Sequence, residues 1–251
     1  MKKIAIIITC LFILIAEQAM AKDISFIEGL TQDAFKDLSK EAAALLSYKN
    51  IAPAEPLGIT GFEIGVESSF VQISTGNNNY WEKAFSYDAP SILPAPKIRV
   101  RKGLPLGIDI GAMYSALPGS NIKLYGAEAS YALLEGGIAT PALGIRGTFT
   151  KLSGVDDLDY QTVGIDASIS KGFVMLTPYG GAGMVYFNSK AKGNLQLLST
   201  ILTGSPLGDE KMWQPRYFAG LRISPMPLFN ITAEVEYLNR MVYSLKAAIT
   251  F

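Results

Sequence analysis

Two groups of carboxylates are the residues in this sequence whose type and spacing could support chemistry. Glu234 and Glu236 lie two positions apart, and two neighbouring acids can act as general acid and general base when their pKa values differ. Asp156, Asp157 and Asp159 offer the oxygen ligands that Ca²⁺ prefers. Both groups have a simpler interpretation, because an acidic cluster on an exposed loop is usually solvated and Glu234 and Glu236 fit a strand pattern. We therefore predict no catalytic residue, no metal site and no cofactor.

The residue types that the chain lacks narrow its chemistry further. There is no histidine, which excludes a Ser-His triad, a histidine general base and histidine-ligated metals. Cys10 is the only cysteine, and it lies in an apolar segment near the N-terminus. Residues 180–183 are glycine-rich but lack the lysine and the following helix of a phosphate-binding loop. Basic and acidic residues balance at 22 each, and this balance does not favour a nucleic-acid partner, which would call for a clustered basic face.

Charged residues recur at every second position within short segments of the chain. In residues 62–67, for example, three apolar side chains share one face of a strand, whereas Glu63 and Glu67 share the other face with a glycine. About ten segments of this kind lie in residues 58–251. The charged residues that the alternation assigns to one face are Glu63, Glu67, Arg99, Arg101, Asp109, Glu128, Arg146, Asp166, Arg222, Glu234, Glu236 and Lys246.

Short and long connections alternate between these segments. Tight turns fall at every second junction, and the junctions between them include long loops at 74–95 and 189–212 and a medium one at 153–159. An even number of strands with this alternation is typical of an all-β, antiparallel up-and-down transmembrane β-barrel of about ten strands. Strands in hydrocarbon must turn apolar side chains outward, so the charged faces should point into the lumen. Aromatic residues near the predicted strand ends would form girdles at the two lipid interfaces: Tyr114, Tyr131, Phe149, Tyr160, Tyr186, Phe187, Tyr217 and Tyr237.

Two interpretations of the lumen charges remain open. In the first, they pair across a narrow interior and hold the barrel closed, since an unpaired charge in a low-dielectric lumen costs several kcal/mol. In the second, some of them line a small polar passage. A barrel of about eight strands is filled by its own side chains, whereas a wide aqueous channel needs about sixteen. About ten strands therefore predict a passage that is narrow or gated.

The first 57 residues lie outside the strand pattern. Residues 1–21 combine a positive start, an apolar run and a small-residue site before Lys22, which is typical of a cleaved secretory signal peptide. Residues 22–57 follow as a helix and a linker, because apolar side chains recur at spacings of three and four over 26–47, with Thr31 as a candidate N-cap. This helix enters the lumen as a plug or lid, packs in the periplasm against the lower rim, or is a mobile segment that becomes ordered only with another protein. Residues 195–202 predict a second short helix.

The last ten residues alternate in the same way and end on phenylalanine. Tyr243, Leu245, Ile249 and Phe251 share one face, and this strand resembles the C-terminal signal that bacterial outer-membrane β-barrel proteins present to the barrel assembly machinery. The resemblance implies assembly in the bacterial outer membrane, with outer-membrane lipid and the assembly machinery as partners, and it implies no substrate. Outer-membrane phospholipases, lipid A deacylases and omptin-type proteases rely on a histidine, which this chain lacks.

The sequence leaves two functional hypotheses from different classes. The first is a narrow pore, or a barrel that binds or transports a small solute, with the lumen charges setting selectivity. The alternative is a structural or surface-interaction barrel with a sealed, ion-paired lumen. An enzyme ranks behind both. A secreted soluble β-sandwich would also alternate, but it would use disulfides or polar outer faces more freely.

Overall fold

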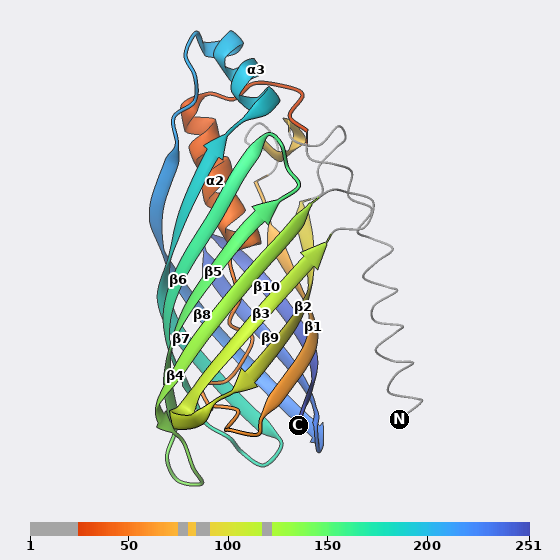
Figure 1. The fold of residues 1–251 in the computed structure, drawn as a ribbon, viewed down its shortest axis with the longest axis vertical. Coiled ribbons are helices and arrows are strands. Elements are labelled where there is room, and N and C mark those ends of the chain that lie inside the picture. Colours follow the sequence, from red (N-terminus) through yellow and green to blue (C-terminus); the bar gives the residue numbers. More distant parts are fainter. Residues whose placement is uncertain (1–24, 75–79, 84–90, 117–121) are drawn as a thin grey trace, which may run out of the picture.

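The computed structural model describes residues 25–74, 80–83, 91–116 and 122–251. Within them, ten antiparallel strands pair in sequence order, and β1 pairs with β10 to close the ring (Figure 1). This confirms the predicted up-and-down barrel. The strands are β1 (Phe62–Gln72), β2 (Ile92–Gly103), β3 (Ile108–Ala116), β4 (Lys123–Glu135), β5 (Ala142–Ser153), β6 (Leu158–Ser170), β7 (Leu176–Ala191), β8 (Glu210–Met226), β9 (Phe229–Leu238) and β10 (Arg240–Thr250).

The two ends of the barrel differ in their connections. One end carries the turns β2–β3, β4–β5, β6–β7 and β8–β9, and there the backbone N–H of Phe62 donates to the carbonyl of Phe251 at 3.1 Å. We call this end of the barrel the short-turn end. Its β2–β3 turn contains a 3₁₀ helix, η3 (Pro105–Gly107). The opposite, long-loop end carries the β1–β2 connection with η2 (Tyr80–Lys83) and the β7–β8 connection with α3 (Gly193–Thr203) (Figure 1).

β2 begins earlier than the sequence indicated. The predicted loop 74–95 is wrong at its C-terminal side, because β2 starts at Ile92 and contains Pro94 and Pro96. These prolines are tolerated because β2 pairs with β1 along this stretch, whereas its pairing with β3 begins only at Ile98. A proline that lacks a backbone donor fits a strand where no neighbour needs that donor. Ser115 of β3 instead donates its hydroxyl to the Pro96 carbonyl at 2.5 Å.

The other predicted loops also prove shorter than expected. The loop predicted at 189–212 narrows to residues 192–209, because β7 runs to Ala191 and β8 starts at Glu210. Its predicted helix is confirmed as α3. The medium loop narrows to 154–157, because β6 starts at Leu158. The strands β6, β7 and β8 are therefore longer at this end of the barrel than the sequence indicated.

Two aromatic residues assigned to the girdles lie inside the barrel instead. Tyr160 and Phe187 are buried and stack on each other, with ring centroids 5.9 Å apart and planes at 13°. This corrects the prediction, and the reason is strand register: both residues share the inward parity of their strands. Tyr114, Tyr131, Phe149, Tyr217 and Tyr237 are exposed on the outer face, as expected for girdle residues, and Tyr186 is half-buried there.

The predicted N-terminal helix is α2 (Gln32–Leu46), and it lies within the long-loop half of the barrel (Figure 1). Thr31 caps it as predicted, since its side chain accepts a hydrogen bond from the backbone N–H of Ala34 at 3.3 Å. The chain then runs down the lumen to the short-turn end, where Gly58 and Gly61 lead into β1. No helix among the described residues is long and apolar enough to cross a membrane.

Candidate functional site

The lumen is filled by the N-terminal segment in two different ways. In its long-loop half, the apolar side of α2 packs against the inner face of the strands, with Phe35, Leu38 and Ala42 fully buried. The wall side chains that receive them are Val71, Met113, Leu152, Val185, Phe187 and Val242. Tyr160 adds a polar anchor, since its hydroxyl donates to the carbonyl of Ser39 at 2.6 Å. Burial of an apolar helix face stabilises the helix inside the barrel.

One acidic side chain of α2 links the helix to the rim of the barrel. Glu41 is buried and accepts hydrogen bonds from the indole of Trp81 at 3.0 Å and from the Nε of Arg240 at 3.0 Å. The hydroxyl of Ser74 donates to it as well, at 2.5 Å. These partners come from η2, from β10 and from the connection just after β1. The carboxylate therefore fixes both the depth and the rotation of α2 within the mouth.

Two residues of the β5–β6 and β7–β8 connections hold the start of the segment. The Asp157 carboxylate accepts from the backbone N–H of Phe26 at 3.0 Å and from that of Asn194 at 2.7 Å. Ser199 of α3 accepts from the backbone N–H of Leu30 at 2.9 Å. Gly29 packs so closely on α3 that an added Cβ would lie 2.5 Å from the Leu198 carbonyl oxygen. The segment thus enters the barrel beneath α3, at the long-loop end.

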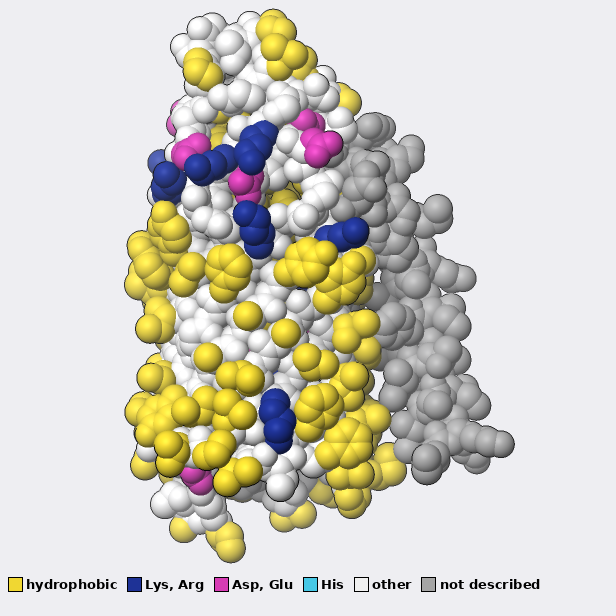
Figure 2. Space-filling view, viewed as in Figure 1, with side chains coloured by type: hydrophobic (Ala, Val, Ile, Leu, Met, Phe, Trp, Pro, Cys, Tyr) yellow, Lys and Arg dark blue, Asp and Glu magenta, His cyan; other side chains and the backbone are white. Residues whose placement is uncertain are grey.

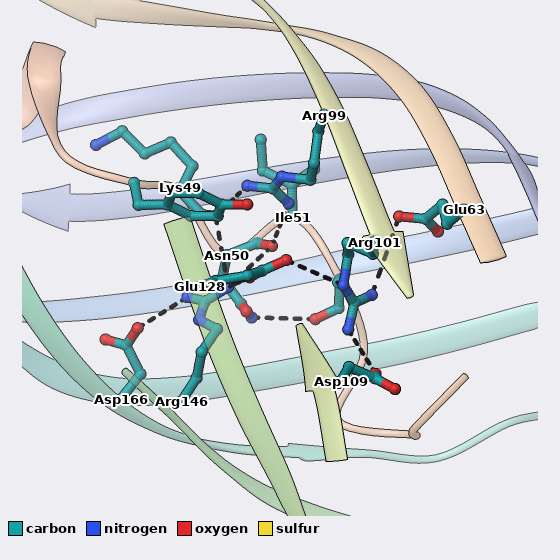
Figure 3. A network of polar contacts seen from close by, with 12 residues as sticks. Lys49, Asn50, Ile51, Glu63, Arg99, Arg101, Asp109, Glu128, Arg146 and Asp166 are labelled. Atoms are coloured by element: carbon teal, nitrogen blue, oxygen red, sulfur yellow. Dashed lines mark hydrogen bonds and ion pairs between the residues drawn. The ribbon is translucent and has the colours of Figure 1, made fainter. Parts of the chain in front are cut away.

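Three arginines from three strands bind the backbone of the linker that follows α2. Arg99 of β2 donates to the carbonyl of Asn50 at 2.9 Å and also to that of Lys49 (Figure 3). Arg146 of β5 donates to the same Asn50 carbonyl at 3.1 Å. Arg216 of β8 donates to the carbonyl of Tyr48 at 2.6 Å. We call Arg99, Arg146 and Arg216 the arginine clamp.

Carboxylates of β9 bind the same stretch of linker from another side. Glu236 accepts from the Lys49 ammonium at 2.6 Å, and both side chains are fully buried. Glu234 accepts from the backbone N–H of Ile51 at 2.8 Å and from the hydroxyl of Tyr179 at 2.9 Å. Ile51 has φ = +38°, a conformation that disfavours a β-branched residue. The surrounding hydrogen bonds therefore hold the linker in a turn that its sequence alone would not favour.

The remaining wall charges pair with one another and with the clamp. Arg101 contacts Asp109 at 2.8 Å, Glu128 at 3.0 Å and Glu63 at 3.9 Å. Asp166 binds both clamp arginines on its side of the barrel: Arg146 at 2.8 Å and the Nε of Arg216 at 2.9 Å. Glu63 closes the ring with Lys246 at 2.8 Å and Arg222 at 3.2 Å, and Glu67 lies 3.3 Å from Arg99.

The structure places the twelve charged residues singled out in the sequence on the inner face of the barrel. Eleven are buried, and Arg222 keeps 14 % of its side-chain surface exposed. Charges in such a place require partners, because an isolated ion in a low-dielectric interior is destabilising by several kcal/mol. The network supplies those partners to both signs, and the linker backbone serves as part of it.

Sequence reasoning missed three basic residues inside the barrel. Lys49 lies in the linker, where no strand alternation applies, and Lys97 lies between the predicted loop 74–95 and the alternation that begins at Ile98. Arg216 shares the parity of Arg222 on β8, so the alternation would have found it if the strand had been extended toward Glu210. All three are buried.

The two acidic groups considered for chemistry have structural partners. Glu234 and Glu236 hold the linker, and Asp157 holds Phe26 and Asn194, as described above. Asp159 pairs with Lys192 at 3.0 Å. Within the part of the chain that the structure describes, no group of three or more Cys, His, Asp or Glu side chains could hold a metal ion. On β10, Tyr243, Leu245 and Phe251 are exposed on the outer face, and Ile249 is half-buried there.

Comparison with known proteins gives no family. No protein-family model matches the chain, and no curated protein matches it. Among solved structures, the N-terminal β-barrel domain of Pseudomonas aeruginosa OprF is 14% identical, with 77% of this chain and 99% of that chain covered and a TM-score of 0.37. The KdgM porin is 9% identical, with 75% and 99% covered and a TM-score of 0.37. The Yersinia pestis outer membrane protein Ail is 15% identical, with 75% and 99% covered and a TM-score of 0.33.

The sequence identities and TM-scores of these matches are low, so the fold is assigned from the geometry of the chain itself. The pairing of β1 with β10 closes the ring, and the inner face carries the charges while the outer face is apolar. The chain is a closed ten-stranded, antiparallel up-and-down β-barrel that holds its own N-terminal segment inside.

Proposed function

We propose that this protein is a bacterial outer-membrane β-barrel. Its outer face supports this, because strand after strand exposes aliphatic and aromatic side chains there, while the inner face carries charges. Such a surface would aggregate in water, whereas a closed barrel satisfies its backbone hydrogen bonds in lipid. The belt is visible in Figure 2. Among its exposed members are Ile64, Ile98, Ile110, Ile145, Ile165, Val235 and Leu245.

The proposed route to the membrane uses both ends of the chain. Residues 1–21 lie outside the described residues and are expected to act as a cleaved signal peptide, and the outward residues of β10 are expected to contact the barrel assembly machinery. The first test is electrophoresis of the outer-membrane fraction with and without boiling. A band that migrates faster when unboiled is expected; a single unshifted band in the soluble periplasmic fraction would contradict the membrane placement.

We infer that the barrel is closed at rest and acts as a structural or surface-interaction barrel. The observation that supports this is the occupied lumen: α2 fills one half, and the arginine clamp binds three successive linker carbonyls in the other. The proposed role is non-catalytic, because the buried carboxylates Glu234 and Glu236 are engaged with the linker. The surface available to a partner is the long-loop end, which carries α3.

Closure can be tested by planar-bilayer conductance together with an engineered disulfide. The mature chain contains no cysteine if cleavage follows residue 21. Ser39 of α2 and Ser189 of β7 have hydroxyl oxygens 2.8 Å apart, so the double variant Ser39→Cys/Ser189→Cys would link the helix to the wall. Ser69→Cys/Ser244→Cys is the matched control, because those hydroxyls are 2.9 Å apart and both belong to the wall.

The expected result is a silent wild-type protein and a conducting Arg99→Gln/Arg146→Gln variant. In that variant, the Ser39–Ser189 disulfide should suppress conductance and reduction should restore it, whereas the Ser69–Ser244 disulfide should have no effect. Steady conductance of the wild-type protein would contradict a lumen that is closed at rest.

A gated narrow passage for a small solute is the second candidate. It is favoured by the chemistry of the linker, whose backbone is held by polar groups that water could replace. A cleft between linker and wall, lined by Ala52, Pro53, Arg101, Asp109 and Arg146, lies on the short-turn side of the clamp. If conductance follows release of the linker, its ion preference should shift in an Arg99→Ala/Arg101→Ala variant. An unchanged preference would exclude these arginines as the selective groups.

A further inference from the structure

Five lysines form a band on the outer face of the barrel at its long-loop end. We call them the lysine band: Lys123 of β4, Lys151 of β5, Lys190 of β7, Lys192 just after β7, and Lys211 of β8. The four that belong to strands occupy outward positions, and the four with ion pairs, Lys192 included, keep 43 to 53% of their side-chain surface exposed. In Figure 2, basic side chains gather above the apolar belt at this end.

The band carries more positive charge than its partners neutralise. Asp159 is shared by Lys151 at 3.8 Å and Lys192 at 3.0 Å. Asp209 is shared in the same way by Lys190 and Lys211, each at 3.3 Å. Two carboxylates therefore serve four ammonium groups.

The nearby acids do not supply the missing charge on the outer face. Asp157 is buried against Phe26 and Asn194, and Glu210 accepts a hydrogen bond from the Gln32 amide. Asp156 is exposed in the β5–β6 connection, outside the strands that carry the band. The outward surface of β4 to β8 is therefore net basic at this height.

Aromatic residues lie directly beneath the band on the same strands. Each aromatic residue lies two residues from its lysine, on the side of the barrel middle: Tyr125 from Lys123, Phe149 from Lys151 and Trp213 from Lys211. At roughly 3.3 Å per residue, two residues span about 7 Å. Tyr186 packs on Trp213 with ring centroids 5.4 Å apart. Aromatic residues at such positions mark the boundary between hydrocarbon and headgroups. The lysines therefore lie at headgroup height.

The basic side chains at the short-turn end are used differently. The Lys171 ammonium donates to the carbonyls of Gly137, Ile138 and Thr140, and that of Lys102 donates to those of Ile59 and Gly61. These two lysines satisfy turn carbonyls, whereas the lysine band makes no such bonds in the described structure beyond its two shared carboxylates.

We propose that the lysine band binds the phosphate groups of lipid headgroups in the leaflet at the long-loop end. The ammonium groups supply charge, and the aromatic and aliphatic side chains beneath them supply the surface for the acyl chains of the same lipid. The outward orientation favours a lipid over a soluble polyanion, because the lysines lie on the outer wall of the barrel between β4 and β8 and do not cover its mouth. This proposal rests on the membrane placement proposed above.

Trp213 provides a reporter for the test. It is half-exposed on the outer face beside Lys211, and the only other tryptophan is Trp81, which is buried. A Trp81→Phe protein, reconstituted as the full mature chain, would report quenching of Trp213 by brominated lipid. Quenching by brominated phosphatidic acid is compared with quenching by brominated phosphatidylcholine, in phosphatidylcholine vesicles at low ionic strength.

A several-fold preference for the anionic lipid is expected. It should fall to near unity in Lys190→Gln/Lys192→Gln/Lys211→Gln and weaken with added salt. Lys40→Gln is the matched control: it removes a positive charge from α2 at the same end but off the outer face, and the preference should persist.

Four outcomes would overturn the proposal. Equal quenching by the two lipids would show that there is no phosphate site, and a preference retained in the triple variant would show that the lysines do not form it. Loss of the preference on adding inorganic phosphate at constant ionic strength would assign the site to free phosphate. If the protein bound a sulfated polysaccharide through these lysines but showed no preference between the two lipids, the lysine band would be a site for a soluble polyanion. No quenching by either lipid would instead contradict the membrane placement itself.

Discussion

Arg99 and Arg146 donate hydrogen bonds to the same acceptor, the carbonyl oxygen of Asn50, at 2.9 and 3.1 Å. The two arginines belong to β2 and β5, which are separated in the barrel by β3 and β4. A single peptide group thus connects distant parts of the wall. The linker is consequently part of the barrel's internal polar structure and is more than a passive filling.

Removing one clamp arginine should destabilise the folded barrel. Arg146→Gln leaves Asp166 and Glu128 with fewer cationic partners in a buried site, and breaking a buried ion pair in this way costs about 3 to 5 kcal/mol. The measurement is urea-induced unfolding in lipid vesicles. Lys151→Gln is the control, because its pair with Asp159 is half-exposed and such pairs contribute about 0 to 1 kcal/mol. Equal effects of the two substitutions would contradict a structural role for the clamp.

Arg216 should not be replaceable by lysine. Its Nε and Nη2 bind the two oxygens of Asp166 while its Nη1 binds the Tyr48 carbonyl, and an ammonium group cannot reproduce that planar geometry. We expect Arg216→Lys to lose about 1.5 to 3 kcal/mol of unfolding free energy although it keeps the charge. Unfolding in vesicles, compared with Lys211→Arg on the same strand, measures this. A wild-type stability for Arg216→Lys would show that charge alone is sufficient.

The segment that precedes α2 should be accessible from outside the cell. Phe26 and Leu30 are bound at the long-loop end, and the segment then passes down the lumen to the short-turn end before β1 begins. In intact cells, a membrane-impermeant maleimide should therefore label Ser25→Cys and should not label Ala139→Cys in the β4–β5 turn. Both sites should react after lysis. Labelling of Ala139→Cys alone in intact cells would reverse the assigned orientation.

The β6–β7 turn should be stabilised by glycine. Val174 has φ = +44°, and the backbone of Phe173 and Leu176 exchanges two hydrogen bonds of 2.7 Å around it. A β-branched residue in this region is strained by about 1 to 2 kcal/mol, so Val174→Gly should raise the urea midpoint. Met175→Gly, next to it but without a positive φ, should give no such gain. A lower midpoint for Val174→Gly would show that the strain is compensated by contacts of the valine.

The sequence by itself determined the strands and which way most of their side chains face. Alternation of charge and apolar residues is read directly from the chain, because successive side chains of a strand point to opposite sides, and this located Glu63, Arg101 and Asp166 on the inner face. The same rule would have placed Tyr160 and Arg216 correctly if the ends of β6 and β8 had been extended. The start of β2 could not be recognised from the sequence, because it contains Pro94 and Pro96. A strand tolerates these prolines only where one of its two sides has no paired neighbour, and the sequence does not show where that is.

Only the tertiary structure decided what occupies the lumen and which groups meet there. The contact of Ile51 with Glu234 joins residues 183 positions apart, and it exists because the barrel closes around the linker. An amphipathic helix pattern indicates that α2 needs an apolar partner, but the pattern is the same whether that partner is the lumen or another protein. The direction in which a strand side chain points is a local property of the pleated backbone. Which side chains meet inside the closed ring depends on the register of all ten strands and on the path of the N-terminal segment through the lumen.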